Sequence, residues 1–169
     1  MLRCKELVIN TTPILALIAA VGSLDMLPLL YGRVWVPWEV CQEVHAGGAN
    51  DFAVSEFAKA DWLHKQNQCV TPPSLLQNSL DSGEAAVIQL ALQQNIPLVA
   101  IDETVGRRFA RLSWLTVTGS IGILLRAKTL GYPLSMQSLC CKTQEILLTS
   151  PDVYNTYHEQ SRNYQKIKK

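Results

Sequence analysis

The chain has 169 residues, of which 48% are hydrophobic and 17% are charged, and its formal net charge at pH 7 is +1. This length accommodates one domain with a full hydrophobic core and is short for two. The composition excludes a disordered chain, and the near-neutral charge excludes a protein that holds nucleic acid by bulk electrostatics alone.

The five cysteines are scattered, none forms a CxxC pair, and no histidine stands at zinc-ligand spacing from them. Such thiols indicate a reducing compartment, so we expect a cytoplasmic protein. The apolar run after Arg3 and Lys5 superficially resembles a signal peptide, but Glu6 and the polar break at 10–13 interrupt the pattern. The run is also far shorter than the roughly 20 residues of a membrane span. We therefore expect no membrane partner, with export as the alternative.

In the first half of the chain, short apolar runs alternate with segments of helical period. The pattern predicts strands over 5–9 and 33–36, and helices over 13–21, 24–30, 38–45 and 50–60. Gly22 is expected to end the helix over 13–21. Residues 61–70 fit no single element, and 71–74 read as a loop.

The second half repeats this alternation more clearly. The pattern predicts a helix from Asp81 through 92, a buried strand over 98–101, a helix over 104–112, a strand over 115–117 and helices over 120–130, 135–149 and 152–167. Alternating strands and helices predict a three-layer α/β/α sandwich with a central, mostly parallel sheet. We expect residues 1–134 to form this α/β domain, with 135–169 as a helical C-terminal extension of the same domain.

Polar side chains follow two predicted strands, where ligands bind in parallel α/β sheets. Asn10 comes after the strand over 5–9, and Asp102 comes after the strand over 98–101. Glu43 lies on the helix after the second strand, and Glu84 lies in the first turn of the helix from Asp81. Carboxylate oxygens without histidine or cysteine beside them suit Mg²⁺ or Mn²⁺ better than zinc. Phosphodiester hydrolysis is the reaction class that follows.

Each acid also has a purely structural interpretation. Glu84 near a helix N-terminus is favourable to the helix dipole with or without a metal. Asp102 is a suitable N-cap for the helix that follows it. Glu39 and Glu43 share a helix face that solvent could cover. These alternatives stay open at the level of single residues.

Five segments in order resemble the PIN-domain family, and most of all the branch related to the VapC toxins of toxin–antitoxin pairs. They are VINTTPILAL, VPWEVCQEV, LDSGEAAVIQLAL, LVAIDETVGRRFA and TGSIGILLRAK. The resemblance spans residues 5–130 and implies a compact α/β/α sandwich with an acidic quartet as its metal site. It also implies a Mg²⁺- or Mn²⁺-dependent ribonuclease acting on RNA, a possible antitoxin protein as partner, and a homodimer.

By position in that family, Asn10 stands where the first aspartate is usual, and Glu43, Glu84 and Asp102 match the second, third and fourth acids. Glu103 is the alternative to Asp102. Asn10 offers a carbonyl oxygen without charge, and affinity for hard cations depends on the charge of the ligands. The alternative hypothesis is therefore a catalytically weakened or silent PIN-fold module that acts through RNA or protein binding.

Further residues beside the expected site are candidates for holding RNA. Thr11 or Thr12 matches the small hydroxyl residue that follows the first acid in the family. Arg107 and Arg108 lie on the helix after Asp102, where arginines could contact RNA phosphates, or could simply form a charged outer helix face.

Overall fold

A five-stranded parallel sheet forms the centre of the computed structural model, which describes residues 5–46 and 51–133. Its strands are β1 (Glu6–Ile9), β2 (Arg33–Val36), β3 (His64–Lys65), β4 (Leu98–Ala100) and β5 (Thr116–Thr118). They lie side by side in the order β3-β2-β1-β4-β5, and every neighbouring pair is parallel. The predicted three-layer α/β/α sandwich with a parallel sheet is confirmed.

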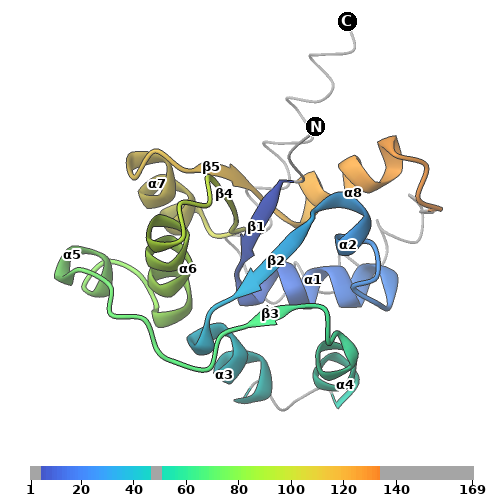
Figure 1. Cartoon of the computed structure of the whole chain (residues 1–169), viewed down its shortest axis with the longest axis horizontal. Coiled ribbons are helices and arrows are strands. Elements are labelled where there is room, and N and C mark those ends of the chain that lie inside the picture. Colours follow the sequence, from blue (N-terminus) through green and yellow to red (C-terminus); the bar gives the residue numbers. More distant parts are fainter. Residues whose placement is uncertain (1–4, 47–50, 134–169) are drawn as a thin grey trace, which may run out of the picture.

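Helices cover both faces of this sheet (Figure 1). Figure 1 shows α6 and α7 to one side of the strands, and α1, α2 and α8 to the other. The helices are α1 (Thr11–Val21), α2 (Leu27–Leu30), α3 (Trp38–Ala46), α4 (Asp51–Lys59), α5 (Ser74–Gln77), α6 (Ser82–Gln93), α7 (Thr104–Leu112) and α8 (Ser120–Thr129). Within the described ranges, no helix is long and apolar enough to cross a membrane.

The core is built where the apolar strands meet these helices. Leu7, Val8 and Ile9 of β1 are fully buried, as are Val99 and Ala100 of β4. A central parallel strand is covered on both faces, so it reads as a continuous apolar run rather than an alternating one. Each large apolar side chain contributes roughly 1.5–3 kcal/mol when it is removed from water. The two central strands thereby fix the position of the residues that follow them.

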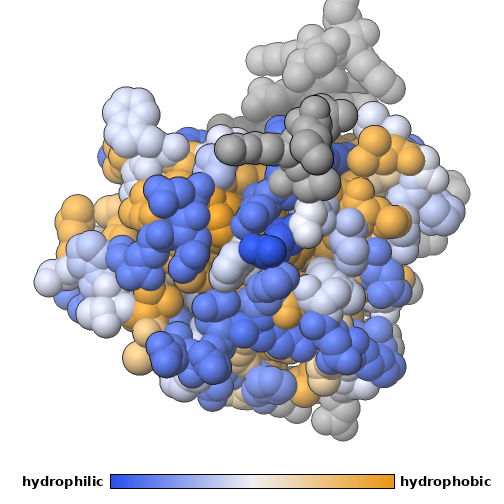
Figure 2. All heavy atoms as spheres, viewed as in Figure 1, coloured by the Kyte–Doolittle hydropathy of each residue, from blue (hydrophilic) through white to orange (hydrophobic). Residues whose placement is uncertain are grey.

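The edge of the sheet at β3 is short and polar. His64 and Lys65 pair with Trp35 and Val36 of β2, and Figure 2 shows mostly hydrophilic surface in front of these strands. A brief charged edge strand discourages pairing with another molecule. The sequence pattern over 61–70 left this strand unassigned, because two residues are too few to show a period.

The chain order creates a switch point between β1 and β4. From β1 the chain moves outward to β2 and β3, and it then crosses back to β4 on the other side of β1. In such sheets, ligands bind in the crevice at the carboxyl ends of the two strands where the direction reverses. Here the backbone N–H of Asn10 donates to the carbonyl oxygen of Ala100 at 3.0 Å, which ties the two strand ends together.

Most element boundaries agree with the predicted ones within a few residues. Gly22 ends α1 in a left-handed conformation with φ of 88°, as its position after the apolar helix suggested. The short helix α5 lies within a segment for which no helix was predicted. The two helices predicted over 135–149 and 152–167 lie outside the described residues.

Candidate active site at the carboxyl ends of β1 and β4

Asn10 occupies the junction between β1 and α1 without capping the helix. Its backbone has the extended conformation of an N-cap residue, but its side chain makes no capping hydrogen bond. The residue is buried, and its Oδ1 atom accepts no hydrogen bond from the described residues. A buried carbonyl oxygen without a donor is unfavourable by about 1–3 kcal/mol, a cost that a hydrogen-bond donor or a cation at this position would remove.

Asp102 follows β4 and reaches across to the start of α8. Its Oδ1 accepts the backbone N–H of Ser120 at 2.9 Å, and the N-cap position of α7 belongs to Glu103. The interpretation of Asp102 as N-cap of the following helix is therefore wrong, because its carboxylate caps a different helix. Burial is the main reason that the pKa of Asp102 is raised to about 6; the hydrogen bonds from Ser120 lower it, and the charge of Glu103 raises it.

Glu84 is buried in the first turn of α6. The helix begins after Asp81, whose Oδ1 accepts the backbone N–H of Glu84 at 2.7 Å. Burial, together with the negative charges of Asp81 and Glu103, raises the pKa of the Glu84 carboxyl to about 8. A hydrogen bond from the backbone of Gly106 opposes these effects. Glu84 is therefore held among other acids, and the helix dipole alone does not account for its position.

Glu43 approaches the same acids from α3 and is half-buried. The Thr11 hydroxyl donates a hydrogen bond to its Oε2, and the backbone N–H of Gly83 also donates to it. Burial raises the pKa of Glu43, as do the charges of Asp81 and Glu103. The solvated-face interpretation also fails for Glu39, which is buried and accepts the backbone N–H of Val70 at 2.8 Å.

Glu103 connects these acids electrostatically. Its charge raises the pKa of Glu43, Glu84 and Asp102, so Glu103 lies within electrostatic reach of each of these three carboxyl groups. The Thr12 hydroxyl donates to Glu103 Oε1, which orients the side chain. Glu103 is therefore the predicted site residue that influences each of the other three acids.

Three glycines make room for three of these carboxylates. A Cβ atom on Gly83 would lie 2.6 Å from both carboxylate oxygens of Glu43, and one on Gly106 would lie 2.2 Å from Glu84 Oε1. A Cβ on Gly119 would lie 2.4 Å from Asp102 Oδ1. Any larger residue would displace the acid beside it. Each glycine lies at or near the beginning of a helix, and the sequence interpretation missed all three.

The unpartnered oxygens indicate which kind of ligand the site favours. Five buried side-chain oxygen or nitrogen atoms of the described residues lack a hydrogen-bond partner, and four of them lie here: Asn10 Oδ1, Glu84 Oε1, Asp102 Oδ2 and Glu103 Oε2. All are oxygens, the donor type that Mg²⁺ and Mn²⁺ prefer. As they stand, no three His, Cys, Asp or Glu side chains within 5–46 and 51–133 are grouped closely enough to hold a metal ion. The donor chemistry fits a hard divalent cation, and ligation requires the acids to draw together.

Comparison with known families agrees with this geometry. A family model described as a PIN domain, DUF3368, matches residues 6–159. The chain belongs to the PIN-domain family. No curated protein and no solved structure matches it. The PIN match continues past residue 134, where we placed the boundary between the α/β domain and its extension.

PIN domains have a nuclease-type fold and generally depend on divalent metals, which agrees with the acidic switch point of this chain. The VapC-like branch, the antitoxin partner and the homodimer stay predictions, because the family model describes only the PIN domain.

The two arginines proposed to contact RNA have different environments in this PIN domain. Arg107 is buried, and its Nη1 donates to the carbonyl oxygens of Ile101 at 2.7 Å and Thr118 at 3.0 Å. Its guanidinium thus joins the ends of β4 and β5. Arg108 is exposed on α7 and is available to a ligand.

Proposed function

We propose that this PIN domain is a divalent-metal-dependent ribonuclease that hydrolyses RNA phosphodiester bonds. The observation that carries the proposal is the set of four buried, unpartnered oxygens at the switch point. Glu43, Glu84, Asp102 and the amide oxygen of Asn10 would hold Mg²⁺ or Mn²⁺, with Glu103 as the alternative ligand. A cation bound there would lower the pKa of a water molecule and polarise a phosphoryl oxygen.

The elevated pKa values determine which of these acids carry a proton before any ligand binds. Glu84, with a pKa of about 8, holds its proton at neutral pH, and Asp102, with a pKa of about 6, mostly does not. Cation binding needs both carboxyl groups ionised, so it releases protons and strengthens as the pH rises. A carboxyl group with a pKa near the working pH is also suited to exchange a proton with a reacting group.

The hydroxyls of Thr11 and Thr12 support the site from α1. They donate to Glu43 and Glu103, so their role is to orient acids rather than to hold RNA. Contact with RNA phosphates then falls to the exposed Arg108, since Arg107 is committed to the backbone.

A second function keeps the same fold without catalysis. Asn10 supplies no charge where the family usually has an aspartate, and a lower ligand charge weakens binding of hard cations. On this alternative the chain binds RNA or a protein partner and does not cut. The toxin role rests on the resemblance to VapC proteins alone.

Cleavage of RNA by the full-length protein separates the two functions. A 5′-labelled single-stranded RNA of mixed sequence is incubated with the wild type in Mn²⁺ or in EDTA. The ribonuclease proposal predicts cleavage only in Mn²⁺, lost in Asp102→Asn and retained in Asp61→Asn, which changes an exposed aspartate. Intact RNA with wild-type protein in Mn²⁺ supports the silent module, and cleavage by Asp102→Asn at the wild-type rate contradicts the proposed site.

A further inference from the structure

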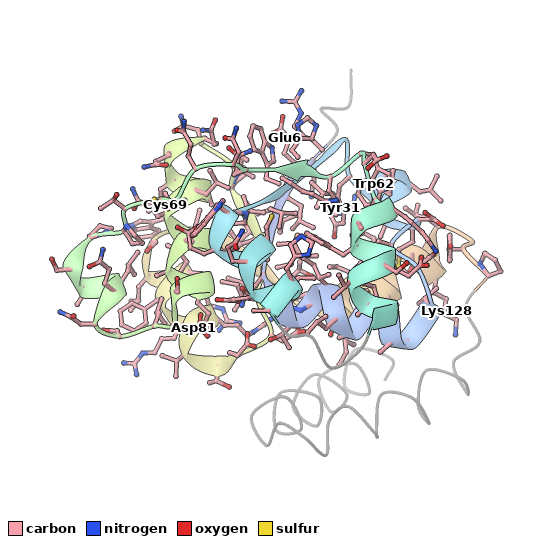
Figure 3. All side chains as sticks on the ribbon, turned by 90° about the horizontal axis from the view of Figure 1, so that it is seen from below. Glu6, Tyr31, Trp62, Cys69, Asp81 and Lys128 are labelled. Atoms are coloured by element: carbon pink, nitrogen blue, oxygen red, sulfur yellow. The ribbon has the colours of Figure 1, made fainter. Side chains whose placement is uncertain are left out.

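A polar pocket lies beside the beginning of α6, the helix that carries Glu84. It has a volume of about 300 Å³ and lies between α3, the beginning of α6 and the segment from β3 to α5. Pro72, Leu80 and Ala85 form an apolar part of its wall, and Glu39 and Asp81 line it as well. Figure 3 labels Asp81 and also Cys69, which lies on the segment from β3 to α5. This volume is at the lower end of the range for small-molecule pockets.

Glu39 is the unexplained group in this wall. Only 8% of the residue is exposed, and its Oε1 accepts the backbone N–H of Val70 at 2.8 Å. Its Oε2 is buried and accepts no hydrogen bond from the described residues. No described basic side chain forms an ion pair with Glu39. A buried carboxylate oxygen without a donor is costly, so an N–H or O–H group that reached Oε2 from the pocket would remove that cost.

Asp81 links this pocket to the acids of the proposed active site. It lines the pocket, its carboxylate caps the helix that carries Glu84, and its charge raises the pKa of both Glu43 and Glu84. A group seated in the pocket therefore borders the residue that caps the helix of Glu84. A single-stranded RNA with its phosphate at the acids could place an adjacent base there, since unstacked bases are commonly read by insertion into protein pockets.

We propose that this pocket selects the base beside the cleaved phosphate, and that Glu39 Oε2 accepts a hydrogen bond from an exocyclic amino group. The proposal rests on the proposed ribonuclease function and adds a specificity-determining residue to it. Carboxylates accept from the N4 amino group of cytosine. Uracil has a carbonyl oxygen at the same ring position, which a carboxylate repels. Cytosine and uracil therefore form a matched pair of probes that differ at the atoms Glu39 would contact.

The substitution Glu39→Gln reverses the polarity of the pocket. The Val70 N–H requires an acceptor, so the amide oxygen of the new side chain stays on Val70 and its NH₂ group takes the place of Oε2. The pocket then presents a donor, which suits the O4 atom of uracil. Glu56→Gln is the control, because it removes one carboxylate from α4, where Glu56 pairs with Lys59 outside the pocket.

The test is titration of the ¹⁵N-labelled full-length protein with cytidine or uridine monophosphate in EDTA, followed by NMR. The backbone amide of Val70 reports directly on the Glu39 carboxylate. We expect this resonance to shift saturably, with cytidine monophosphate binding about fivefold more tightly than uridine monophosphate, the low end for one base contact. In Glu39→Gln the order of the two nucleotides should reverse, and in Glu56→Gln it should not change.

The proposal is overturned if the Val70 amide responds to neither nucleotide, if the wild type binds both equally, or if Glu39→Gln retains the wild-type preference. Because the titration contains no metal and no cleavable RNA, it is independent of the cleavage assay. If the protein cleaves RNA but the Val70 amide resonance does not shift with either nucleotide, the base-pocket proposal is wrong and the ribonuclease proposal stands. If Glu39→Gln reverses the preference between the two nucleotides but the wild type does not cleave RNA, the base-pocket proposal stands and the ribonuclease proposal is wrong.

Discussion

Glu84 Oε1 lies where a side chain on Gly106 would be, since an ideal Cβ at Gly106 would come within 2.2 Å of that oxygen. The first turn of α7 therefore approaches the first turn of α6 closely enough for a backbone N–H to reach the buried carboxylate. Gly83 and Gly119 make the same kind of room for Glu43 and Asp102. The backbone at each of these three glycines comes so close to a carboxylate that a side chain would not fit there.

The substitution Gly106→Ala should displace Glu84. A glycine-to-alanine change inside a helix ordinarily stabilises by about 0.5–1 kcal/mol, whereas here we expect a loss of roughly 1–3 kcal/mol in the free energy of unfolding, because the methyl group overlaps a carboxylate. Urea denaturation measures this loss. In a Glu84→Ala background most of the penalty should vanish, because the obstructing oxygen is gone. Equal penalties in both backgrounds would show that the two residues are not coupled.

The stability of the metal-free protein should fall as the pH rises. In the folded protein the pKa of Glu84 is about 8 and that of Asp102 about 6, both above their ordinary values of 4.5 and 3.8. The folded state therefore binds more protons than the unfolded state, and the stabilisation present below pH 4 is lost progressively up to about pH 8. Urea denaturation in EDTA across this range tests the sign. Glu84→Gln should flatten the upper part of the decline, and a stability that rises with pH would contradict these assignments.

The substitution Asn10→Asp should strengthen metal binding and weaken the metal-free fold. An additional carboxylate among ionised acids adds ligand charge, so we expect Mn²⁺ affinity at pH 8 to increase about tenfold or more, equivalent to about 1.4 kcal/mol. In EDTA the same charge has no partner, and the free energy of unfolding should drop by roughly 1–3 kcal/mol. Calorimetric titration and urea denaturation measure the two effects. Unchanged Mn²⁺ affinity would place Asn10 outside the metal site.

Substitution of Arg107 should affect the stability of the fold, whereas substitution of Arg108 should affect RNA binding. Arg107→Gln removes the donor to Ile101 and Thr118 and should lower the free energy of unfolding by roughly 1–3 kcal/mol. Arg108→Gln should leave stability within about 0.5 kcal/mol of the wild type, because the side chain is exposed. It should instead weaken RNA binding in EDTA and reduce the salt dependence by about one phosphate contact, measured by fluorescence anisotropy. An unchanged salt dependence would remove Arg108 from the RNA surface.

The sequence predicted the parallel α/β/α fold and the four elements that carry Asn10, Glu43, Glu84 and Asp102, because apolar runs and helix-start residues are local features. It did not predict β3, because a two-residue strand is defined by its pairing with Trp35 and Val36 and not by its own pattern. The structural alternative for Asp102, an N-cap of the helix that follows it, was wrong because its partner Ser120 lies on α8, 18 residues further along the chain.

Contacts between distant segments account for the rest of the site. The glycine beside each acid belongs to another element, so a single sequence gives no reason to connect Gly106 with Glu84 or Gly119 with Asp102. The burial of Glu39 depends on the segment that carries Val70, which lies 31 residues away along the chain.

Binding of Mn²⁺ to the full-length protein tests the central claim most directly. Isothermal titration at pH 8 should show saturable binding to the wild type, accompanied by proton release, and both should be lost in Asp102→Asn but kept in Asp61→Asn. No binding at millimolar Mn²⁺, or binding that Asp102→Asn leaves intact, would contradict the assignment of these acids as a metal site.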